Sequence, residues 1–218
     1  MARAVRNVIF DLGGVVFDWN PDHIVARVQP VPELRAALKE ALFGHADWRL
    51  FDRGTLSESE LTGRLQSRIG ATRREVEAIL DAVRNSLVEK PETLELIREL
   101  QEQGTPLYCL SNMPGSIYTH LRQRHGFWDV FSGIVISGEV QMMKPEPEVF
   151  MHLLEKFNLR AEESVFVDDL RANIESAGQV GLHTVWFKDA AQCRRELEQI
   201  LDTMADPTVV PGVTRTRI

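Results

Sequence analysis

The sequence has few cysteines and no apolar run long enough to cross a membrane. Its 218 residues include two cysteines, Cys109 and Cys193. Because Cys109 lies within an apolar segment, we expect reduced, buried thiols rather than a disulfide. No apolar run approaches the roughly 18 residues of a membrane span, and the start of the chain lacks the features of a signal peptide. These absences favour a cytoplasmic protein that does not enter a membrane.

The sequence also lacks an excess of positive charge. Lysine and arginine number 25 against 32 acidic residues, so the formal net charge is −7, and the arginines are scattered. This balance argues against nucleic acid as the main partner. A phosphorylated metabolite is not excluded, because a few cations and backbone amides can converge locally in an acidic protein. With 44% hydrophobic residues, the chain can bury the core of one domain plus an insertion.

Short apolar segments indicate the fold class. They lack polar–apolar alternation, so they suit parallel strands that are covered on both faces. The segments between the later ones have helical periodicity, which favours an α/β protein with a Rossmann-like parallel sheet. Ligands of such sheets gather at the carboxyl ends of the strands. The apolar segments are residues 8–10, 106–110, 133–137, 164–167 and 183–187.

A long stretch of helical character separates the first two of these segments. It spans roughly ninety residues, far more than a crossover helix requires. Apolar residues recur there with helical spacing, and Ser57 with Glu60 forms a predicted capping box. We therefore predict a small helical cap domain inserted after the first strand. The predicted division is a core of residues 1–17 and 89–204, a helical cap of residues 18–88 and an extended C-terminal tail of residues 205–218.

Residues able to do chemistry follow four of the predicted strands. Each alone is more often a turn, capping or surface residue. The carboxyl ends of parallel strands meet at one edge of a sheet, however, so these residues can share one site. An acidic pair directly after a buried strand needs a cation, and magnesium binds carboxylates together with substrate phosphate. In chain order the residues are Asp11, Ser111 with Asn112, Lys144, and Asp168 with Asp169.

This set suits phosphoryl transfer. A carboxylate nucleophile attacks phosphorus and gives an acyl-phosphate that water then hydrolyses. Magnesium, the lysine, the serine hydroxyl and loop amides would offset the charge on the phosphoryl oxygens. Two glycines after Asp11 leave backbone amides free to approach phosphate. The candidate phosphate-binding residues are Gly13, Gly14, Ser111, Asn112 and Lys144.

With these residues in place, the sequence resembles the haloacid dehalogenase (HAD) superfamily. FDLGGVVFD resembles its first motif, LSN its second, KPEPEVF its third and VFVDDLRANIESAGQVGLHTVWF its fourth. The motifs lie in the right order between Phe10 and Phe187, and the helical insertion is similar to the cap of the phosphatase-type members. The nearest resemblance is to small-sugar phosphatases that act like α-D-glucose-1-phosphate phosphatase, which share the stretch seen here as Arg53 to Ser57.

The resemblance implies a role for each motif residue. Asp11 would be the nucleophile, and Ser111 with Lys144 would hold the transferring phosphoryl group. Asn173, which follows the acidic pair on the next helix, could orient these carboxylates by hydrogen bonding. Asn112 is expected to fix its loop. The implied Mg²⁺ ligands are Asp11, the backbone carbonyl of Gly13, Asp168 and Asp169.

One residue departs from the pattern of the family. In most phosphatases of the superfamily a second aspartate, two residues after the nucleophile, protonates the leaving alcohol and later activates water. Here that position is Gly13. The protein could be a phosphatase whose leaving group departs readily, such as an anomeric hydroxyl, helped by water, a substrate hydroxyl or a cap residue. Asp18 could be recruited, although a turn is its more common role.

Two other readings of Gly13 stay open. A 2-haloacid dehalogenase would use Asp11 without a metal, because a halide needs no proton, but Asp168 and Asp169 argue against it. A phosphate-binding protein without catalysis is less favoured, since the other reactive residues are all present. The sequence thus predicts a magnesium-dependent phosphatase, monomer or homodimer, for a small phosphorylated metabolite, with a phosphosugar as the preferred substrate class.

Substrate selection is expected in the helical cap. Aromatic faces suit a sugar ring, and an arginine suits a phosphate or carboxylate, which makes Trp19, Trp48 and Arg53 the first candidates. The alternatives are that Trp48 packs in the core of the cap and that Arg53 pairs with a neighbouring acid. Further candidates are Asn20, His23, His45 and Phe51.

Overall fold

A five-stranded parallel sheet forms the centre of the molecule. The computed structural model describes residues 5–205, so the predicted C-terminal tail lies, beyond Ala205, outside the described residues. The strand order is β3-β2-β1-β4-β5, and all neighbouring strands are parallel. The predicted α/β class with a Rossmann-like sheet is confirmed. The strands are β1 (Asn7–Phe10), β2 (Leu107–Ser111), β3 (Gly133–Ile136), β4 (Ser164–Asp168) and β5 (His183–Trp186).

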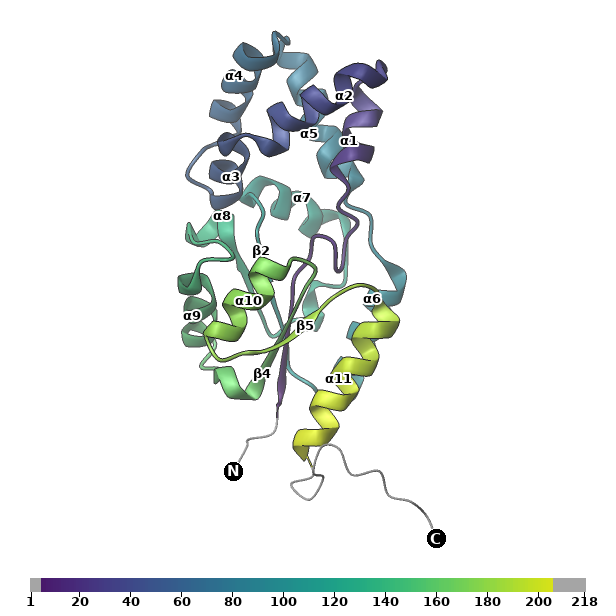
Figure 1. Ribbon diagram of the computed structural model, residues 1–218, viewed down its shortest axis with the longest axis vertical. Coiled ribbons are helices and arrows are strands. Elements are labelled where there is room, and N and C mark those ends of the chain that lie inside the picture. The colour runs from purple at the N-terminus through teal and green to yellow at the C-terminus, as the bar shows by residue number, and fades with distance from the viewer. Residues whose placement is uncertain (1–4, 206–218) are drawn as a thin grey trace.

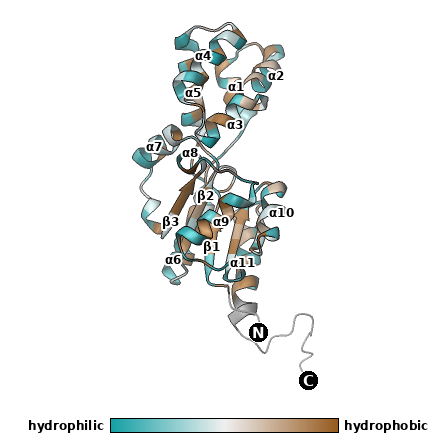
Figure 2. Ribbon diagram, turned by 90° about the vertical axis from the view of Figure 1, so that its left-hand side faces the viewer, coloured by the Kyte–Doolittle hydropathy of each residue, from teal (hydrophilic) through white to brown (hydrophobic). Residues whose placement is uncertain are grey.

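Helices cover both faces of this sheet (Figure 1). One face carries a core shared by α9 and α10, to which Ile9 and Phe166 contribute. The other face packs against α6, α7 and α11 through residues such as Phe10 and Val167. Burial on both faces explains why the strands are continuous apolar segments, which are mostly brown in Figure 2. The core elements are α6 (Pro91–Glu102), α7 (Gly115–Arg124), η2 (Trp128–Val130), α8 (Ser137–Val140), α9 (Pro147–Lys156), η3 (Ala161–Glu163), α10 (Arg171–Gln179) and α11 (Ala190–Ala205).

The helical cap lies beyond the carboxyl edge of the sheet (Figure 1). The predicted capping box is confirmed, because Ser57 and Glu60 satisfy each other's backbone amides at the start of α4. Thr72 and Glu75 form a second one at the start of α5. An N-terminal cap of this kind stabilises a helix by about 1 kcal/mol. The elements of the cap are α1 (Pro21–Val28), α2 (Pro32–Lys39), η1 (Glu40–Gly44), α3 (Ala46–Arg53), α4 (Glu58–Ile69) and α5 (Arg73–Ser86).

The chain enters and leaves the helical cap through two adjacent segments. The amide of Asp18 donates to the carbonyl of Val88, and the amide of Lys90 donates to the carbonyl of Val16, each over 2.8 Å. The two segments are thus paired where the predicted domain boundary falls. The division into two domains stays a prediction, but its two crossing points lie together.

Two further observations concern the cysteines and the length of the helices. Cys109 and Cys193 are buried and unpaired, as predicted. Burial raises the pKa of both thiols, that of Cys193 to about 12. Within residues 5–205, no helix is both long and apolar enough to span a membrane.

Candidate active site

The predicted catalytic residues meet at the carboxyl edge of the central strands. Asp11 directly follows β1, Ser111 is the last residue of β2, and Asp168 is the last residue of β4. Strand β1 pairs with both β2 and β4, and the Asp11 amide donates to the carbonyl of Val167 over 2.9 Å. The sheet therefore brings the side chain of Asp11 together with Ser111 and Asp168, which follow it by 100 and 157 positions in the sequence.

A buried lysine links two of these carboxylates. The Nζ atom of Lys144 lies 2.8 Å from Oδ1 of Asp11 and 2.7 Å from Oδ2 of Asp168, and its side chain is 1% exposed. A buried charge of this kind needs such partners, because its desolvation costs several kcal/mol. Although burial alone lowers the pKa of Lys144, the two carboxylates raise it above its usual value. The ammonium therefore stays charged at the edge of the sheet.

The loop that carries Lys144 is fixed by Asn112. Nδ2 of Asn112 donates to the carbonyl of Lys144 over 2.8 Å, and the amide of Lys144 donates to Oδ1 of Asn112 over 2.9 Å. This reciprocal pair ties the loop between α8 and α9 to the residue that follows β2. The side chain of Asn112 thus acts on the position of Lys144, while the peptide after Lys144 is cis.

Asp168 is held by a second set of hydrogen bonds. Nδ2 of Asn173 lies 3.0 Å from both carboxylate oxygens, and the amide of Leu170 donates to Oδ1 over 2.8 Å. Asn173 comes from α10, which starts beyond the acidic pair. The expected orienting contact of Asn173 therefore reaches Asp168. Together with Lys144, it leaves this carboxylate in one orientation.

Three carboxylates gather where a cation would fit. Asp11, Asp168 and Asp169 each offer an oxygen, and these atoms lie within 4.8 Å of one another. Lys144 forms an ion pair with Oδ1 of Asp11 without the geometry of a hydrogen bond, so within residues 5–205 this buried atom accepts no hydrogen bond. Carboxylate oxygens gathered in this way are ligands that Mg²⁺ prefers. The residues present therefore fit a magnesium ion.

The cluster also shifts the protonation of its members. Burial raises the pKa of Asp11 to about 7, with Asp168 and Asp169 adding to the effect and Lys144 opposing it. Burial and Asp168 raise the pKa of Asp169. A divalent cation among these carboxylates would stabilise their charged forms and so lower both pKa values.

The two glycines after the nucleophile differ in how closely other atoms approach them. Gly14 has a φ of +77°, and a Cβ placed on it would lie 2.3 Å from Oδ2 of Asp169. The absence of a side chain thus lets the Asp169 carboxylate sit against the backbone. A Cβ on Gly13 would meet only the Cβ of Trp19, at 3.9 Å. Position 13, which lacks the family's second aspartate, therefore has room for a side chain.

A cavity of about 230 Å³ opens over these residues. Its polar end contains Asp11, Ser111, Lys144 and Asp169, so the candidate nucleophile faces the cavity. Its remaining wall is largely apolar and comes from both the helical cap and the core. The lining residues of that wall are Trp19, Trp48, Asp52, Leu87, Met113, Pro114, Ile117 and Leu170.

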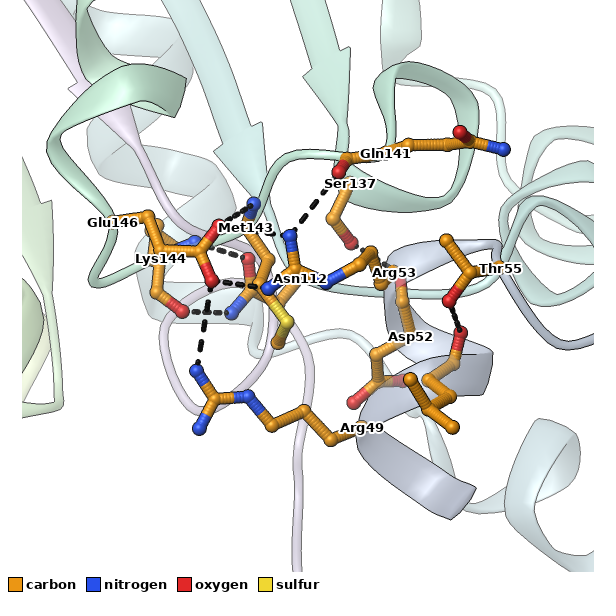
Figure 3. A network of polar contacts seen from close by, with 11 residues as sticks. Arg49, Asp52, Arg53, Thr55, Asn112, Ser137, Gln141, Met143, Lys144 and Glu146 are labelled. Carbon is orange, nitrogen blue, oxygen red and sulfur yellow. Dashed lines mark hydrogen bonds and ion pairs between the residues drawn. The ribbon is translucent and has the colours of Figure 1, made fainter. Parts of the chain in front are cut away.

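The predicted substrate residues separate into two groups. Trp19 and Trp48 line the cavity, and their rings are stacked with centroids 6.4 Å apart. Trp48 is also buried, as the packing alternative predicts, and so is Phe51. Arg53 is not among the lining residues. Its guanidinium binds both carboxylate oxygens of Glu146 and donates to the carbonyl of Gln141 over 3.2 Å (Figure 3).

The other candidates of the helical cap have local roles. Oδ1 of Asn20 accepts a hydrogen bond from the amide of His23 at the start of α1. Nδ1 of His45 accepts one from the amide of Asp47 at the start of α3. None of Asn20, His23 and His45 lines the cavity over Asp11. They are capping or surface residues of the helical cap.

Sequence reasoning missed Asp52, which lines the cavity beside the residues it did select. A signal was present, because Asp52 follows Trp48 by four residues on α3 and so shares its face of the helix. Leu87, Ile117 and Leu170 were missed as well. Their role depends on how the helical cap meets the core, which no local pattern indicates.

Comparisons with known proteins place this arrangement in a family. A model of haloacid dehalogenase-like hydrolases matches residues 5–181. A sesquiterpene phosphatase of Aspergillus oryzae is 30% identical over 203 residues, which cover 92% of this chain and 99% of that protein. An enzyme of the HAD family from Bacteroides thetaiotaomicron, in complex with magnesium and inorganic phosphate, has a TM-score of 0.70 and 22% identity, over 84% of this chain and 94% of its own.

An L-2-haloacid dehalogenase of Xanthobacter autotrophicus has a TM-score of 0.64 and 18% identity, over 95% of this chain and 85% of its own. At such identities the two structural likenesses show the shared fold. The family model covers most of the chain and includes every residue of the site from Asp11 to Asn173. The chain therefore belongs to the haloacid dehalogenase-like hydrolases.

Proposed function

We propose that the protein is a magnesium-dependent phosphatase that hydrolyses a small phosphate monoester through an aspartyl-phosphate on Asp11. The observation that carries the proposal is the position of the Asp11 carboxylate. It faces a cavity, lies against the ammonium of Lys144, and shares a three-carboxylate cluster with Asp168 and Asp169. A nucleophile, a fixed cation and a magnesium site thus converge at one point.

The residues divide the reaction between them. An oxygen of Asp11 attacks phosphorus, the bond to the leaving alcohol breaks, and water later releases phosphate from the aspartyl group. Lys144 and the hydroxyl of Ser111 hold the phosphoryl oxygens and stabilise the charge that they carry. Asp168 and Asp169, with Asp11, would hold magnesium, which supplies further positive charge to the phosphoryl group when bound.

The acidic cluster favours a phosphatase over a dehalogenase. Displacement of a halide by Asp11 needs no metal, whereas Asp168 and Asp169 bring further negative charge to the site and raise the pKa of Asp11. That effect hinders a nucleophile unless a cation is present. The cluster therefore supports the magnesium-dependent reaction.

The cavity supports an apolar alcohol as the preferred leaving group. Apart from the phosphate and metal residues, the described lining residues with a carboxyl or amide side chain are Asp52 and Asn173, and the amide of Asn173 already donates to Asp168. A sugar would bury several hydroxyls with too few partners, and each unpaired polar group costs about 1–3 kcal/mol. The similar protein from Aspergillus oryzae is named a sesquiterpene phosphatase, which agrees with an apolar substrate.

A sugar phosphate is the second candidate substrate. The resemblance to sugar phosphatases predicts it, and the stacked rings of Trp19 and Trp48 offer the aromatic surface on which a sugar ring can lie. Both candidates share the phosphate end of the site. They differ only in what the wall of the cavity would contact.

Phosphate release from a substrate panel tests the proposal. The panel contains an isoprenoid monophosphate, a hexose 1-phosphate, a hexose 6-phosphate and p-nitrophenyl phosphate, each with magnesium and with excess chelator. We expect release that requires magnesium and is fastest for the isoprenoid phosphate. The control is Asp11→Asn, which should release none. Absence of release from every substrate, or halide release from 2-haloacids in chelator, would contradict the proposal.

A further inference from the structure

The proposed reaction needs a proton donor that position 13 does not provide. An alcohol leaves as an alkoxide unless a group in the site protonates it, and general acid catalysis of this kind contributes roughly 10²–10⁴-fold. Gly13 has no side chain, and Lys144 is held between Asp11 and Asp168. A side chain that acts as the donor must therefore come from another part of the cavity wall.

Asp52 lies in that wall. It belongs to α3 of the helical cap and lines the cavity together with Asp11 and Ser111. Of the described lining residues, it carries the one carboxyl group outside the cluster that fits magnesium. Its side chain thus has the chemistry and the location of an acid and base for a substrate bound between the helical cap and the sheet.

The backbone of Asp52 is tied to the phosphate-binding loop. The hydroxyl of Ser137, on α8, donates to the Asp52 carbonyl (Figure 3). The same hydroxyl accepts a hydrogen bond from the amide of Met113 over 2.9 Å. Met113 follows Ser111 and Asn112 in the loop after β2. A single side chain therefore connects Asp52 to the loop that directly follows Ser111.

The next two residues of the chain also dock on the core. Arg53 is paired with Glu146, next to the loop of Lys144, through two hydrogen bonds. Gly54 has a φ of +79°, and a Cβ placed on it would lie 2.2 Å from the carbonyl oxygen of Gly138. The two backbones therefore approach as closely as glycines allow. Three consecutive residues fix the end of α3 and hold Asp52 over the cavity.

The Asp52 carboxyl has no competing partner. Within residues 5–205 it receives no hydrogen bond and forms no ion pair, and burial raises its pKa well above the usual value. The charged groups around it are engaged elsewhere: Arg49 and Arg53 face Glu146, and Lys144 faces Asp11. Glu139 of α8 is exposed. The carboxyl thus retains a proton at a pH where an ordinary aspartate has lost it.

We propose that Asp52 is the catalytic acid and base of the reaction, supplied by the helical cap in place of the aspartate missing at position 13. The proposal rests on the phosphatase function proposed above. As the Asp11 oxygen bonds to phosphorus, the bond from phosphorus to the leaving oxygen breaks, and that oxygen takes the Asp52 proton. A water then attacks phosphorus and gives its proton to Asp52, while the bond to Asp11 breaks and phosphate leaves.

The variant Asp52→Asn tests this role, because it keeps the size of the side chain and removes the proton. Hydrolysis of the best alkyl phosphate should fall roughly 10²–10⁴-fold. With p-nitrophenyl phosphate, whose leaving group needs no proton, the first step should survive while the second slows. We therefore expect a burst of about one nitrophenol per enzyme and accumulation of phosphorylated Asp11, detected by intact mass.

The pH dependence gives a second readout. Because the acid must be protonated, kcat/KM of the wild type for the alkyl phosphate should fall as the pH rises through the raised pKa of Asp52. Asp52→Asn should lack this decline, whereas a residue with a merely structural role would leave it in place. Thermal unfolding of the variant, expected close to wild type, checks that the fold is intact.

Two control variants separate proton transfer from other effects. Asp18→Asn makes the same change at an exposed aspartate outside this cavity and should leave both substrates unaffected. Arg53→Gln keeps the carboxyl but weakens the docking of α3 that positions it. The alkyl phosphate should therefore lose more rate than the aryl phosphate, by less than in Asp52→Asn, and the decline of kcat/KM with pH should remain. A matching loss on both substrates without a burst in Asp52→Asn, or wild-type rates on the alkyl phosphate, would overturn the proposal. If the wild type itself releases no phosphate, the phosphatase function fails first.

Discussion

The two ends of the cavity are built from different kinds of structure. The phosphate end consists of residues at or near the ends of adjacent strands, where defined hydrogen bonds hold Asp168, through Asn173 and Lys144, and the loop of Lys144, through Asn112. The opposite wall consists of side chains from helices and loops of both the cap and the core, packed mainly by apolar contact. The first end can fix the chemistry, while the second can vary with the alcohol that leaves.

The largest effect should come from the nucleophile at the phosphate end. Asp11→Asn removes the attacking oxygen, so turnover should fall by at least about three orders of magnitude. The fold should persist, because an amide replaces a carboxyl whose ionisation burial already disfavours. A phosphate-release assay measures the loss of turnover, and thermal unfolding shows whether the fold persists. Retained turnover would show that another residue attacks phosphorus.

Lys144→Met should destabilise the folded protein by removing the cation at the same end. It leaves Asp11 and Asp168 buried beside each other without their cation, and loss of one partner from a buried ion pair costs about 3–5 kcal/mol. Chemical denaturation measures the change. Magnesium should recover part of the lost stability, since a cation in the cluster replaces some of the missing charge. A variant as stable as wild type in chelator would contradict this account.

Alanine substitutions at the adjacent glycines form a matched pair, and the expected loss of stability is intermediate. Gly14→Ala combines a strained φ with a contact of 2.3 Å to Asp169, so it should cost roughly 1–3 kcal/mol. The added methyl group of Gly13→Ala meets no close atom, so the free energy of unfolding of this variant should lie within about 0.5 kcal/mol of the wild-type value. Magnesium-induced stabilisation, measured by thermal shift, should weaken only in Gly14→Ala. Equal destabilisation of the two variants would contradict the close approach of Asp169.

The smallest effect is expected at the apolar wall. Leu170 lines the cavity and is 57% exposed, so Leu170→Ser removes substrate contact with little loss of core packing. KM for an isoprenoid phosphate should rise by up to about tenfold, with kcat nearly unchanged, because such contacts bind substrate and transition state alike. Steady-state kinetics on this substrate and on a hexose phosphate measure the rise in KM for each. A larger rise for the hexose phosphate would favour the sugar reading.

The same contrast explains how much could be predicted from the sequence. Apolar segments define strands, and the residue after each parallel strand lies at one edge of the sheet, so Asp11, Ser111 and Asp168 could be placed together without coordinates. Asp52 could not be placed in this way. Its position depends on Ser137, which is 85 residues distant, and on the close approach of two glycine backbones. Contacts between helices leave no local pattern.

The docking of α3 on α8 also concerns the timing of the reaction. Ser137 and Glu146 hold the end of α3 and with it Asp52, while α4 and α5 of the helical cap contact α7 through the Ser116–Glu58 and Arg124–Asn85 hydrogen bonds. Any movement that separates α3 from α8 would carry the acid away from the nucleophile. Proton transfer would then be confined to the assembled state, so that an aspartyl-phosphate could neither form on an alkyl substrate nor be hydrolysed efficiently while the site stands open.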